Sequence, residues 1–416
     1  MIAIFTGVSG LRAHQFAVNV IANNIANINT IAFKAGRVSF QDALSQTLRP
    51  ASAPTEGGRG GTNPKQVGLG VTIGSISNLM SQGNLKPTGR VTDLAVEGAG
   101  FFVLGDAAGM YFTRDGVFEL DANNVLVHAT TGMKLLGWRA DPLTGEIQAS
   151  SMLTPQSELI IPLGGKSVAR PTSQVEYQSN LDASAAVGDQ VTSTFYVYDS
   201  LGESHQMDLA FTKTAAGEWS WEIASPDADP ASPPSTGTLQ FDVDGQVDPA
   251  SAVGTFTLDL ADANGADDPI SCQISFAEVT QLYGQSTIQM QSQDGLPMGT
   301  LQSFYIDQSG LITGNYTNGM FERLGQIALA SFANAAGLDK LGGNLYSQST
   351  NSGLPTVVKP GTADAGNMAS GHLEMSNVDL AEEFANLIVI SRGFQANSRV
   401  ITTGDEMLQE LLNIKR

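Results

Sequence analysis

The chain has 416 residues, 42% of them apolar, so it is long enough for roughly two to four domains and too apolar to be disordered throughout. Only 15% of the residues are charged, and 21 basic against 41 acidic side chains leave a formal net charge of −20. Such an acidic chain is repelled by phosphate backbones and anionic lipid surfaces, which argues against binding to nucleic acids or membrane surfaces. No apolar run approaches the roughly 18 residues of a membrane-spanning helix, so we expect no membrane insertion.

Residues 1–30 carry apolar side chains at every seventh position, which is typical of a helix. Seven residues make about two helical turns, so these side chains form one stripe along the helix. The segment contains no proline, and Asn27-Ile28-Asn29-Thr30 supplies a stop signal. The predicted stripe consists of Ile4, Leu11, Val18 and Ile25.

A second row on this predicted helix carries neutral amide side chains at intervals of four residues. An ordinary solvated helix face accounts for such a row. The alternative is a face that meets other subunits or a water-filled bore, where neutral polar groups are tolerated and charge is unwanted. The row consists of Gln15, Asn19, Asn23 and Asn27.

The middle of the chain has the composition of linkers and β structure. Residues 31–90 are predicted as an extended linker, because 50–90 are rich in glycine and proline, as in Glu56-Gly57-Gly58-Arg59-Gly60-Gly61. Short apolar alternations with turn residues then predict a first outer β domain from residues 91–145 and 291–349. Residues 146–290 are predicted as an inserted second outer β domain, and 350–372 as the returning linker.

Residues 373–416 again predict a long helix with an apolar stripe at intervals of seven. Ser376-Asn377-Val378-Asp379 matches a capping box, and Lys415 and Arg416 have the charge that favours a helix C-terminus. The side chains four residues after each stripe position are mixed, so a simple two-stranded coiled coil is not expected. The predicted stripe consists of Leu380, Leu387, Phe394, Ile401 and Leu408.

The predicted fold class is therefore mainly β with long α-helical termini. The chain is expected to be a discontinuous, rod-like multidomain protein. Its terminal helices, in residues 1–30 and 373–416, would form a coiled-coil-like polymerisation core, and the two outer β domains would lie between them in sequence.

Motifs for catalysis or cofactor binding fail on spacing. Gly164-Gly165-Lys166-Ser167 lacks the earlier glycine of a phosphate-binding loop, and Asp242-Val243-Asp244-Gly245 lacks the glycine and glutamate positions of a calcium loop. Cys272 has no histidine near it in sequence and is predicted to be a core residue. We expect no catalytic residue, no metal site and no cofactor; the histidines lack ligand spacing and are His14, His128, His205 and His372.

Three separated motifs resemble the bacterial flagellar rod, hook and hook-associated proteins. Asn23-Asn24-Ile25-Ala26-Asn27 with Phe33-Lys34 resembles the N-terminal signature of that family, although its members usually carry glycine where this chain has Ala32. The C-terminal signature resembles Ser376-Asn377-Val378-Asp379 and Gly393-Phe394-Gln395-Ala396-Asn397. The segment Thr92–Phe102 is similar to the strand that opens the first outer domain of the family.

The resemblance implies a helical homopolymer in the bacterial flagellum, located outside the cell. Rod proteins of the family lack a large central insertion, so residues 146–290 and the segment Tyr198-Asp199-Ser200-Leu201-Gly202 favour the hook branch, a curved tube that carries torque. A distal rod protein or a hook–filament junction protein is the alternative. Implied partners are further copies of the chain, the rod, the hook cap, the junction proteins and the flagellar type III export apparatus.

Two further expectations concern export and an unrelated function. The start of the chain, Met1–Phe5, has no basic residue and its apolar run breaks at Thr6-Gly7, so no cleaved signal peptide is expected. Trp219 and Trp221 lie on one face of a predicted strand, which suits either a sheet core or the aromatic surface of a secreted carbohydrate-binding protein.

Overall fold

The computed structural model describes residues 2–54, 60–141, 145–148, 152–164, 167–262, 264–362 and 365–414. It is mainly β with a helix at each end, as the sequence predicted. Residue contacts divide it into unit 1 (residues 1–161, 305–313 and 323–416) and unit 2 (residues 162–304 and 314–322). This division is coarser than the predicted four-part organisation, which stays a prediction. Each unit is described by itself.

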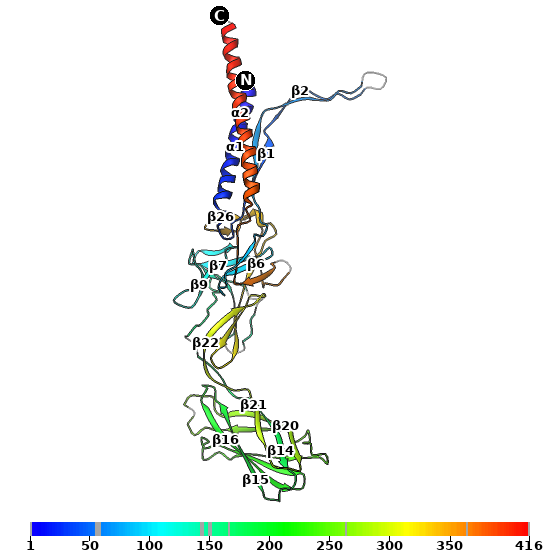
Figure 1. The fold of residues 1–416 in the computed structure, drawn as a ribbon, viewed down its shortest axis with the longest axis vertical. Helices are drawn as coiled ribbons and strands as arrows, with labels where there is room; N and C mark the ends of the chain where they lie inside the picture. The colour runs from blue at the N-terminus through cyan, green and yellow to red at the C-terminus, as the bar shows by residue number, and fades with distance from the viewer. Residues whose placement is uncertain are drawn as a thin grey trace. The chain divides into compact units, whose positions relative to one another are not determined.

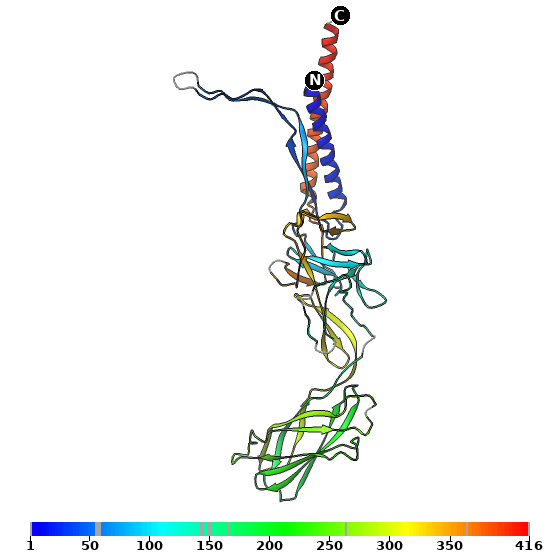
Figure 2. The same cartoon turned by 180° about the vertical axis from the view of Figure 1, so that it is seen from behind.

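The two helices of unit 1 are α1, Ile2–Ala26, and α2, Leu380–Ile414, and they lie side by side (Figures 1 and 2). Asp379 caps α2, because its Oδ1 accepts hydrogen bonds from the backbone N–H groups of Ala381 at 2.8 Å and Glu382 at 3.4 Å. The predicted cap at Ser376 is therefore wrong by three residues. The Asn377 side chain forms hydrogen bonds with the backbone of Ala35 and Leu79, which keeps residues 376–378 outside the helix. Lys415 and Arg416 lie outside the described residues.

A long antiparallel hairpin follows α1 in unit 1. Its strands are β1 (Gly36–Asp42), β2 (Ser45–Arg49), β3 (Lys65–Gly68) and β4 (Val71–Asn78). Strand β1 pairs with β4, and β2 pairs with β3. The segment predicted as an extended linker thus forms paired strands over much of its length, and Glu56, Gly57, Gly58 and Arg59 lie outside the described residues.

The β region of unit 1 brings together strands from both halves of the chain. One sheet has the order β26-β27-β8-β7-β11-β10-β9, with β25 on β7 and β28 on β25. Returning strands pair directly with outgoing ones, β29 with β6 and β30 with β5. The bounds are β5 Leu85–Pro87, β6 Leu94–Glu97, β7 Phe101–Asp106, β8 Gly109–Thr113, β9 Phe118–Leu120, β10 Leu126–His128, β11 Lys134–Leu135, β12 Gly137–Arg139, β25 Leu329–Ser331, η1 Ala335–Gly337, β26 Asp339–Gly342, β27 Leu345–Ser347, β28 Thr356–Val358, β29 Asn367–Ser370 and β30 His372–Glu374.

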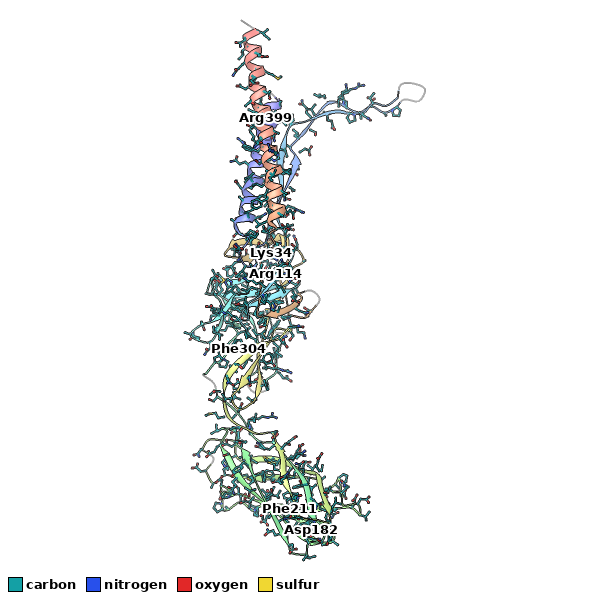
Figure 3. All side chains as sticks on the ribbon, viewed as in Figure 1. Lys34, Arg114, Asp182, Phe211, Phe304 and Arg399 are labelled. Atoms are coloured by element: carbon teal, nitrogen blue, oxygen red, sulfur yellow. The ribbon has the colours of Figure 1, made fainter. Side chains whose placement is uncertain are left out.

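Unit 2 contains a β-sandwich of two sheets, ordered β15-β16-β17-β18 and β19-β20-β14-β21. Aromatic rings from both sheets meet in its core, where Tyr177 contacts Phe211, labelled in Figure 3. Trp219 and Trp221 are buried in the same core, as the sheet-core interpretation predicted. The bounds are β13 Ser167–Arg170, β14 Gln174–Asp182, β15 Gln190–Tyr198, β16 Ser204–Ala215, β17 Glu218–Ala224, β18 Ser235–Gln240, β19 Val253–Leu258, β20 Ile270–Leu282 and β21 Gln289–Gln293. Three further strands each have one part in unit 1 and the other in unit 2: β22 (Leu296–Ile306), β23 (Leu311–Tyr316) and β24 (Phe321–Ile327).

Candidate functional site

The two terminal helices contact each other through small residues. Among the described side chains of α1, the buried positions fall at helical spacing and are Gly7, Gly10, Ala13, Ala17, Ile21 and Asn24. A methyl carbon placed on Gly10 would lie 2.7 Å from Asn397 Oδ1 of α2, and one placed on Gly7 would lie 3.0 Å from Ile401 Cγ1. Side chains larger than hydrogen at these two glycines would therefore push the helices apart.

Glycines of α2 receive larger side chains of α1 in the same way. A methyl carbon on Gly393 would lie 2.8 Å from His14 Cε1, and one on Gly404 would lie 2.9 Å from Ile4 Cγ1. His14 also contacts the Phe40 ring of β1, with 5.5 Å between ring centroids. The helix pair thus has small residues on both sides of its interface.

Of the predicted apolar stripes, Ile4 and Ile401 belong to this interface, and among the described residues no such contact places the other members in it. Ile4, Leu11, Val18 and Ile25 are all half-buried, and so are Leu387 and Ile401. The remaining members of the α2 stripe are between 38% and 39% exposed: Leu380, Phe394 and Leu408. Of the predicted amide row, Asn27 is half-buried, and Gln15, Asn19 and Asn23 are exposed. Their predicted role in assembly stays a prediction.

Asn24 joins three segments at the end of α1. Its side chain is buried and exchanges two hydrogen bonds with the backbone of Gly36, at 2.8 and 2.9 Å. Its Nδ2 also donates to Glu383 Oε1 of α2 at 2.8 Å. Burial raises the pKa of Glu383, and the hydrogen bond from Asn24 opposes that shift. Asn24 therefore fixes the start of β1 against both helices.

Asn377 plays the same part on the returning chain. Its Oδ1 accepts from the backbone N–H of Ala35 at 2.8 Å, and its Nδ2 donates to the carbonyl of Leu79 at 2.8 Å. Its own N–H donates to the carbonyl of Phe33 at 3.3 Å. These bonds hold the residues before α2 against the segment after α1.

A buried group of three charged side chains, here called the ionic clasp, lies next to these asparagines and consists of Lys34, Arg114 and Glu374. Lys34 Nζ lies 2.6 Å from Glu374 Oε1, and Arg114 Nη1 lies 3.6 Å from Glu374 Oε2. All three side chains are at most 3% exposed, and Figure 3 labels Lys34 and Arg114 next to each other in unit 1.

Backbone groups complete the ionic clasp. Glu374 Oε1 also accepts from the N–H of Gly83 at 2.8 Å, and Lys34 Nζ donates to the carbonyl of Ser81 at 2.8 Å. Burial lowers the pKa of Lys34, while Glu374 acts to raise it, and burial likewise lowers the pKa of Arg114. One carboxylate thus holds two buried cations, so the loss of Glu374 would leave both without their counter-ion.

The remaining residues of the two predicted signatures have supporting positions. Ala26 is the last residue of α1, Phe33 is half-buried, and Val378 is 9% exposed. On α2, Asn397 Nδ2 donates to the carbonyl of Gly393 at 2.9 Å, which holds the side chain against α1. Gln395 is exposed and accepts a hydrogen bond from Arg392.

Sequence reasoning missed Glu374, Arg114 and the interface glycines Gly7, Gly10 and Gly404, and it named Gly393 only as part of the family signature. A charged residue between apolar neighbours, as in Leu373-Glu374-Met375, is one signal of a buried charge in a chain with so few charges. Glycines at helical spacing inside a predicted helix were the signal for a close helix contact.

The motifs set aside for chemistry have structural positions. Ser167 begins β13 where a phosphate loop needs a helix, and Gly165 and Lys166 lie outside the described residues. Asp242 Oδ1 accepts from the N–H groups of Asp244 and Gln246, which makes this segment a turn. Cys272 is buried and burial raises its pKa to about 12, as expected of a core residue.

The described residues also bear on metal binding and on membrane insertion. In this part of the chain no group of three or more His, Cys, Asp and Glu side chains could hold a metal ion. None of the described helices is both long and apolar enough to cross a membrane.

Family models match the chain along most of its length. They are "Flagella basal body rod protein" at residues 4–34, "Flagellar hook protein FlgE/F/G D1 domain" at 95–168, "Flagellar basal body protein FlaE D2 domain" at 169–296 and "Flagellar basal body rod FlgEFG protein C-terminal" at 369–414. The matches at residues 4–34 and 369–414 contain most of the helix pair, and they also contain Asn24, Lys34, Glu374 and Asn377.

Three full-length relatives share one name. The chain is 40% identical over 467 residues to "Flagellar hook protein FlgE" of Treponema pallidum and 39% identical over 446 residues to that of Borreliella burgdorferi, with 100% of each chain covered in both comparisons. It is 34% identical over 426 residues to the protein of that name from Escherichia coli, covering 99% of this chain and 100% of the other. The chain therefore belongs to the flagellar hook protein family.

Proposed function

We propose that this hook-family subunit polymerises through its terminal helices into a curved, flexible tube that carries torque from the flagellar rod to the filament. The observation that carries the proposal is the large apolar surface that a single copy leaves exposed on its helices and hairpin.

Helix α2 has apolar side chains that the described residues of the same chain leave largely exposed. Exposed fractions of 49% at Phe384, 61% at Ile388 and 68% at Val389 are high for large apolar residues in one short stretch. Farther along α2, Met407 and Leu412 are 63% and 68% exposed, and on α1 Phe5 is 69% exposed. Contiguous apolar surface of this kind marks an interaction site. Further copies of the chain, with their own exposed helices, are the proposed occupant.

The β2–β3 hairpin also has an uncovered apolar face. Leu44 and Leu48 lie four positions apart, so they share one face of the hairpin, and each is 64% exposed. Val67 pairs with Gln46 on that face and is 40% exposed. A two-stranded hairpin is marginally stable in water on its own. We therefore assign this face to contact with neighbouring copies as well.

The predicted stripes and amide row complete the proposal. The half-buried stripe residues Leu11, Val18 and Ile25, together with the part of Ile4 that does not face Gly404, would pack against helices of adjacent subunits in a coiled-coil-like core. The exposed amides Gln15, Asn19 and Asn23 would face further subunits or the bore. The outer β domains would form the outer layers of the tube.

The partners and export route follow from the family resemblance and remain proposals. The subunit would contact the flagellar rod, the hook cap and the hook–filament junction proteins at the ends of the tube. It would leave the cell through the flagellar type III export apparatus without a cleaved signal peptide.

Polymerisation of the full chain tests this function. We expect concentrated protein to form tubes visible by negative-stain electron microscopy, and the double variant Ile388→Ser with Val389→Ser to stay monomeric in sedimentation. Val243→Ser is the matched control, because Val243 is fully exposed in unit 2. Tubes formed equally well by the double variant would contradict the proposal.

A further inference from the structure

The turn Tyr198–Gly202 joins β15 to β16 in unit 2 and is held in one shape by its own hydrogen bonds. The buried Asp199 accepts from the N–H groups of Leu201 at 2.9 Å and Glu203 at 2.7 Å through its Oδ1. Its backbone N–H donates to the carbonyl of Glu203 at 3.0 Å. An Asp side chain that bonds to the following backbone in this way stiffens a turn.

This turn lies against the two strands that lead into and out of the sandwich. These strands, here called the neck, are β13 and residues 296–300 of β22, which pair with each other. Gly202 has a left-handed φ of 86°, and a methyl carbon placed on it would lie 2.7 Å from Met298 N and 2.8 Å from Ala169 Cβ. The contact therefore has no room for a side chain at Gly202.

A second set of contacts ties the neck to the sandwich where the chain passes between them. Thr172 donates its N–H to the carbonyl of Tyr198 at 2.9 Å, and its Oγ1 accepts from the N–H of Tyr198 at 2.8 Å. Asp294 accepts from the N–H of Ser173 at 2.8 Å and lies 3.6 Å from Arg170 Nη2. These bonds cluster where the chain crosses, and a single point of attachment permits tilting. The Gly202 contact lies at the other end of the same turn from Tyr198, and contacts at both ends of the turn restrict the tilt.

We propose that Gly202 is a positioning residue that sets the angle between the sandwich and its neck. The inference deepens the proposed function, because this angle decides how the sandwiches of adjacent copies would meet in a tube. The angle itself belongs to the single subunit and is measured there.

Spin labels at Val243→Cys in the sandwich and Gln302→Cys beyond the neck report the angle as a distance. Both positions are exposed, whereas Cys272 is buried with a raised pKa and reacts poorly with labelling reagents. In the labelled full chain, Gly202→Ala inserts a methyl group into a close-packed contact, so we expect the mean distance to shift by about 2 Å or more.

Gly188→Ala is the matched control for backbone strain. Gly188 lies in the same sandwich with φ 98°, but a methyl carbon there would meet no atom within 4 Å. Both variants place an alanine in a left-handed backbone conformation, which costs strain energy, and only the methyl group of Gly202→Ala also clashes with the neck. We expect the distance in Gly188→Ala to equal that of the parent. Met298→Ala should also leave it unchanged, because Gly202 meets the backbone nitrogen of Met298.

An unchanged distance in Gly202→Ala, or an equal shift in Gly188→Ala, would overturn the proposal. Should Gly202→Ala fail to fold, Ala169→Gly opens the same contact from the neck, and we expect a broader distance distribution than in the parent. An unbroadened distribution there would likewise overturn it. Because the distances come from single subunits, failure of the parent to form tubes would count against the proposed function alone.

Discussion

Lys34 and Glu374 form a buried ion pair with 2.6 Å between Nζ and Oε1, although 340 positions separate them in the chain. Lys34 follows α1 and Glu374 precedes α2, so the pair ties the outgoing chain to the returning chain next to both helices. Arg114 shares the carboxylate, which makes Glu374 the counter-ion of two buried cations. The two chain ends are thus fastened together beside the surface that we assign to assembly.

Removal of the Glu374 charge should destabilise unit 1 strongly. Glu374→Gln keeps the shape and leaves Lys34 and Arg114 buried without a carboxylate, so we expect a loss of about 3–5 kcal/mol in the free energy of unfolding. Chemical denaturation, monitored through the far-UV circular dichroism of the helices, measures this free energy. The control is Glu119→Gln, since Glu119 pairs with Arg90 at the surface and should cost less than about 1 kcal/mol. Equal costs for the two variants would contradict the role of the ionic clasp.

Acidification from neutral pH should stabilise the fold at Glu383, because protonation removes a partly buried negative charge. The folded chain has a raised pKa at Glu383, so between pH 4.5 and that raised pKa it binds more protons there than the unfolded chain. Stability from this group is therefore present below pH 4.5 and is lost as the pH rises through the folded pKa. Glu383→Gln keeps an acceptor for Asn24 and removes the titration.

The measurement is the free energy of unfolding against pH for the parent and the Glu383→Gln variant. We expect the parent to lose stability relative to the variant as the pH rises above 4.5. Glu406→Gln, an exposed change on the same helix, should follow the parent. Parallel curves for the parent and Glu383→Gln would show that burial of Glu383 has no energetic consequence.

The close approach of α1 and α2 should depend on Gly10. Gly10→Leu places a large side chain where a methyl carbon already lies 2.7 Å from Asn397, so we expect a loss of about 1–3 kcal/mol and no polymerisation. Ala22→Leu makes a comparable enlargement on the exposed side of α1 and should leave the unfolding free energy within about 0.5 kcal/mol. Normal tubes from Gly10→Leu would rule out the close helix pair in the assembly.

Position 32 should accept a glycine with little change in stability, whereas a branched side chain there should destabilise the fold. It has a left-handed φ of 56° and is 1% exposed. Glycine relieves roughly 1–2 kcal/mol of strain, and the lost methyl burial and greater freedom of the unfolded chain offset most of it, so Ala32→Gly should lie within about 1 kcal/mol of the parent. Ala32→Val should cost about 2 kcal/mol or more. Thermal melts of both variants check this, and a valine variant as stable as the parent would refute the strained, packed turn.

Local pattern predicted the elements of this fold. Spacing of seven predicted both terminal helices, and alternation predicted strands such as the one that contains Trp219 and Trp221. The cap of α2 was misplaced because Ser376 and Asp379 both suit a cap, and the choice between them rests on Asn377 bonding to Ala35 and Leu79, almost 300 positions or more away.

The candidate site was harder to predict because its contacts join distant segments. No periodicity links Lys34 to Glu374 or to Arg114, since Lys34 lies between α1 and β1, Arg114 follows β8 and Glu374 ends β30. The spacing of large apolar side chains indicated Leu11 and Val18, whereas the helices touch through Gly7 and Gly10, where the close approach depends on the absence of a side chain. Asn24 was identified through the family signature, without the contacts that explain it.

The most direct test of the account is hydrogen exchange at residues 380–414 of the full chain, compared between dilute single subunits and assembled tubes. The apolar side chains of α2 that a single copy leaves exposed should make this helix poorly protected when dilute and strongly protected in tubes. Slow exchange across α2 in dilute monomers, with no further protection on concentration, would contradict the claim that the chain ends are assembly surfaces.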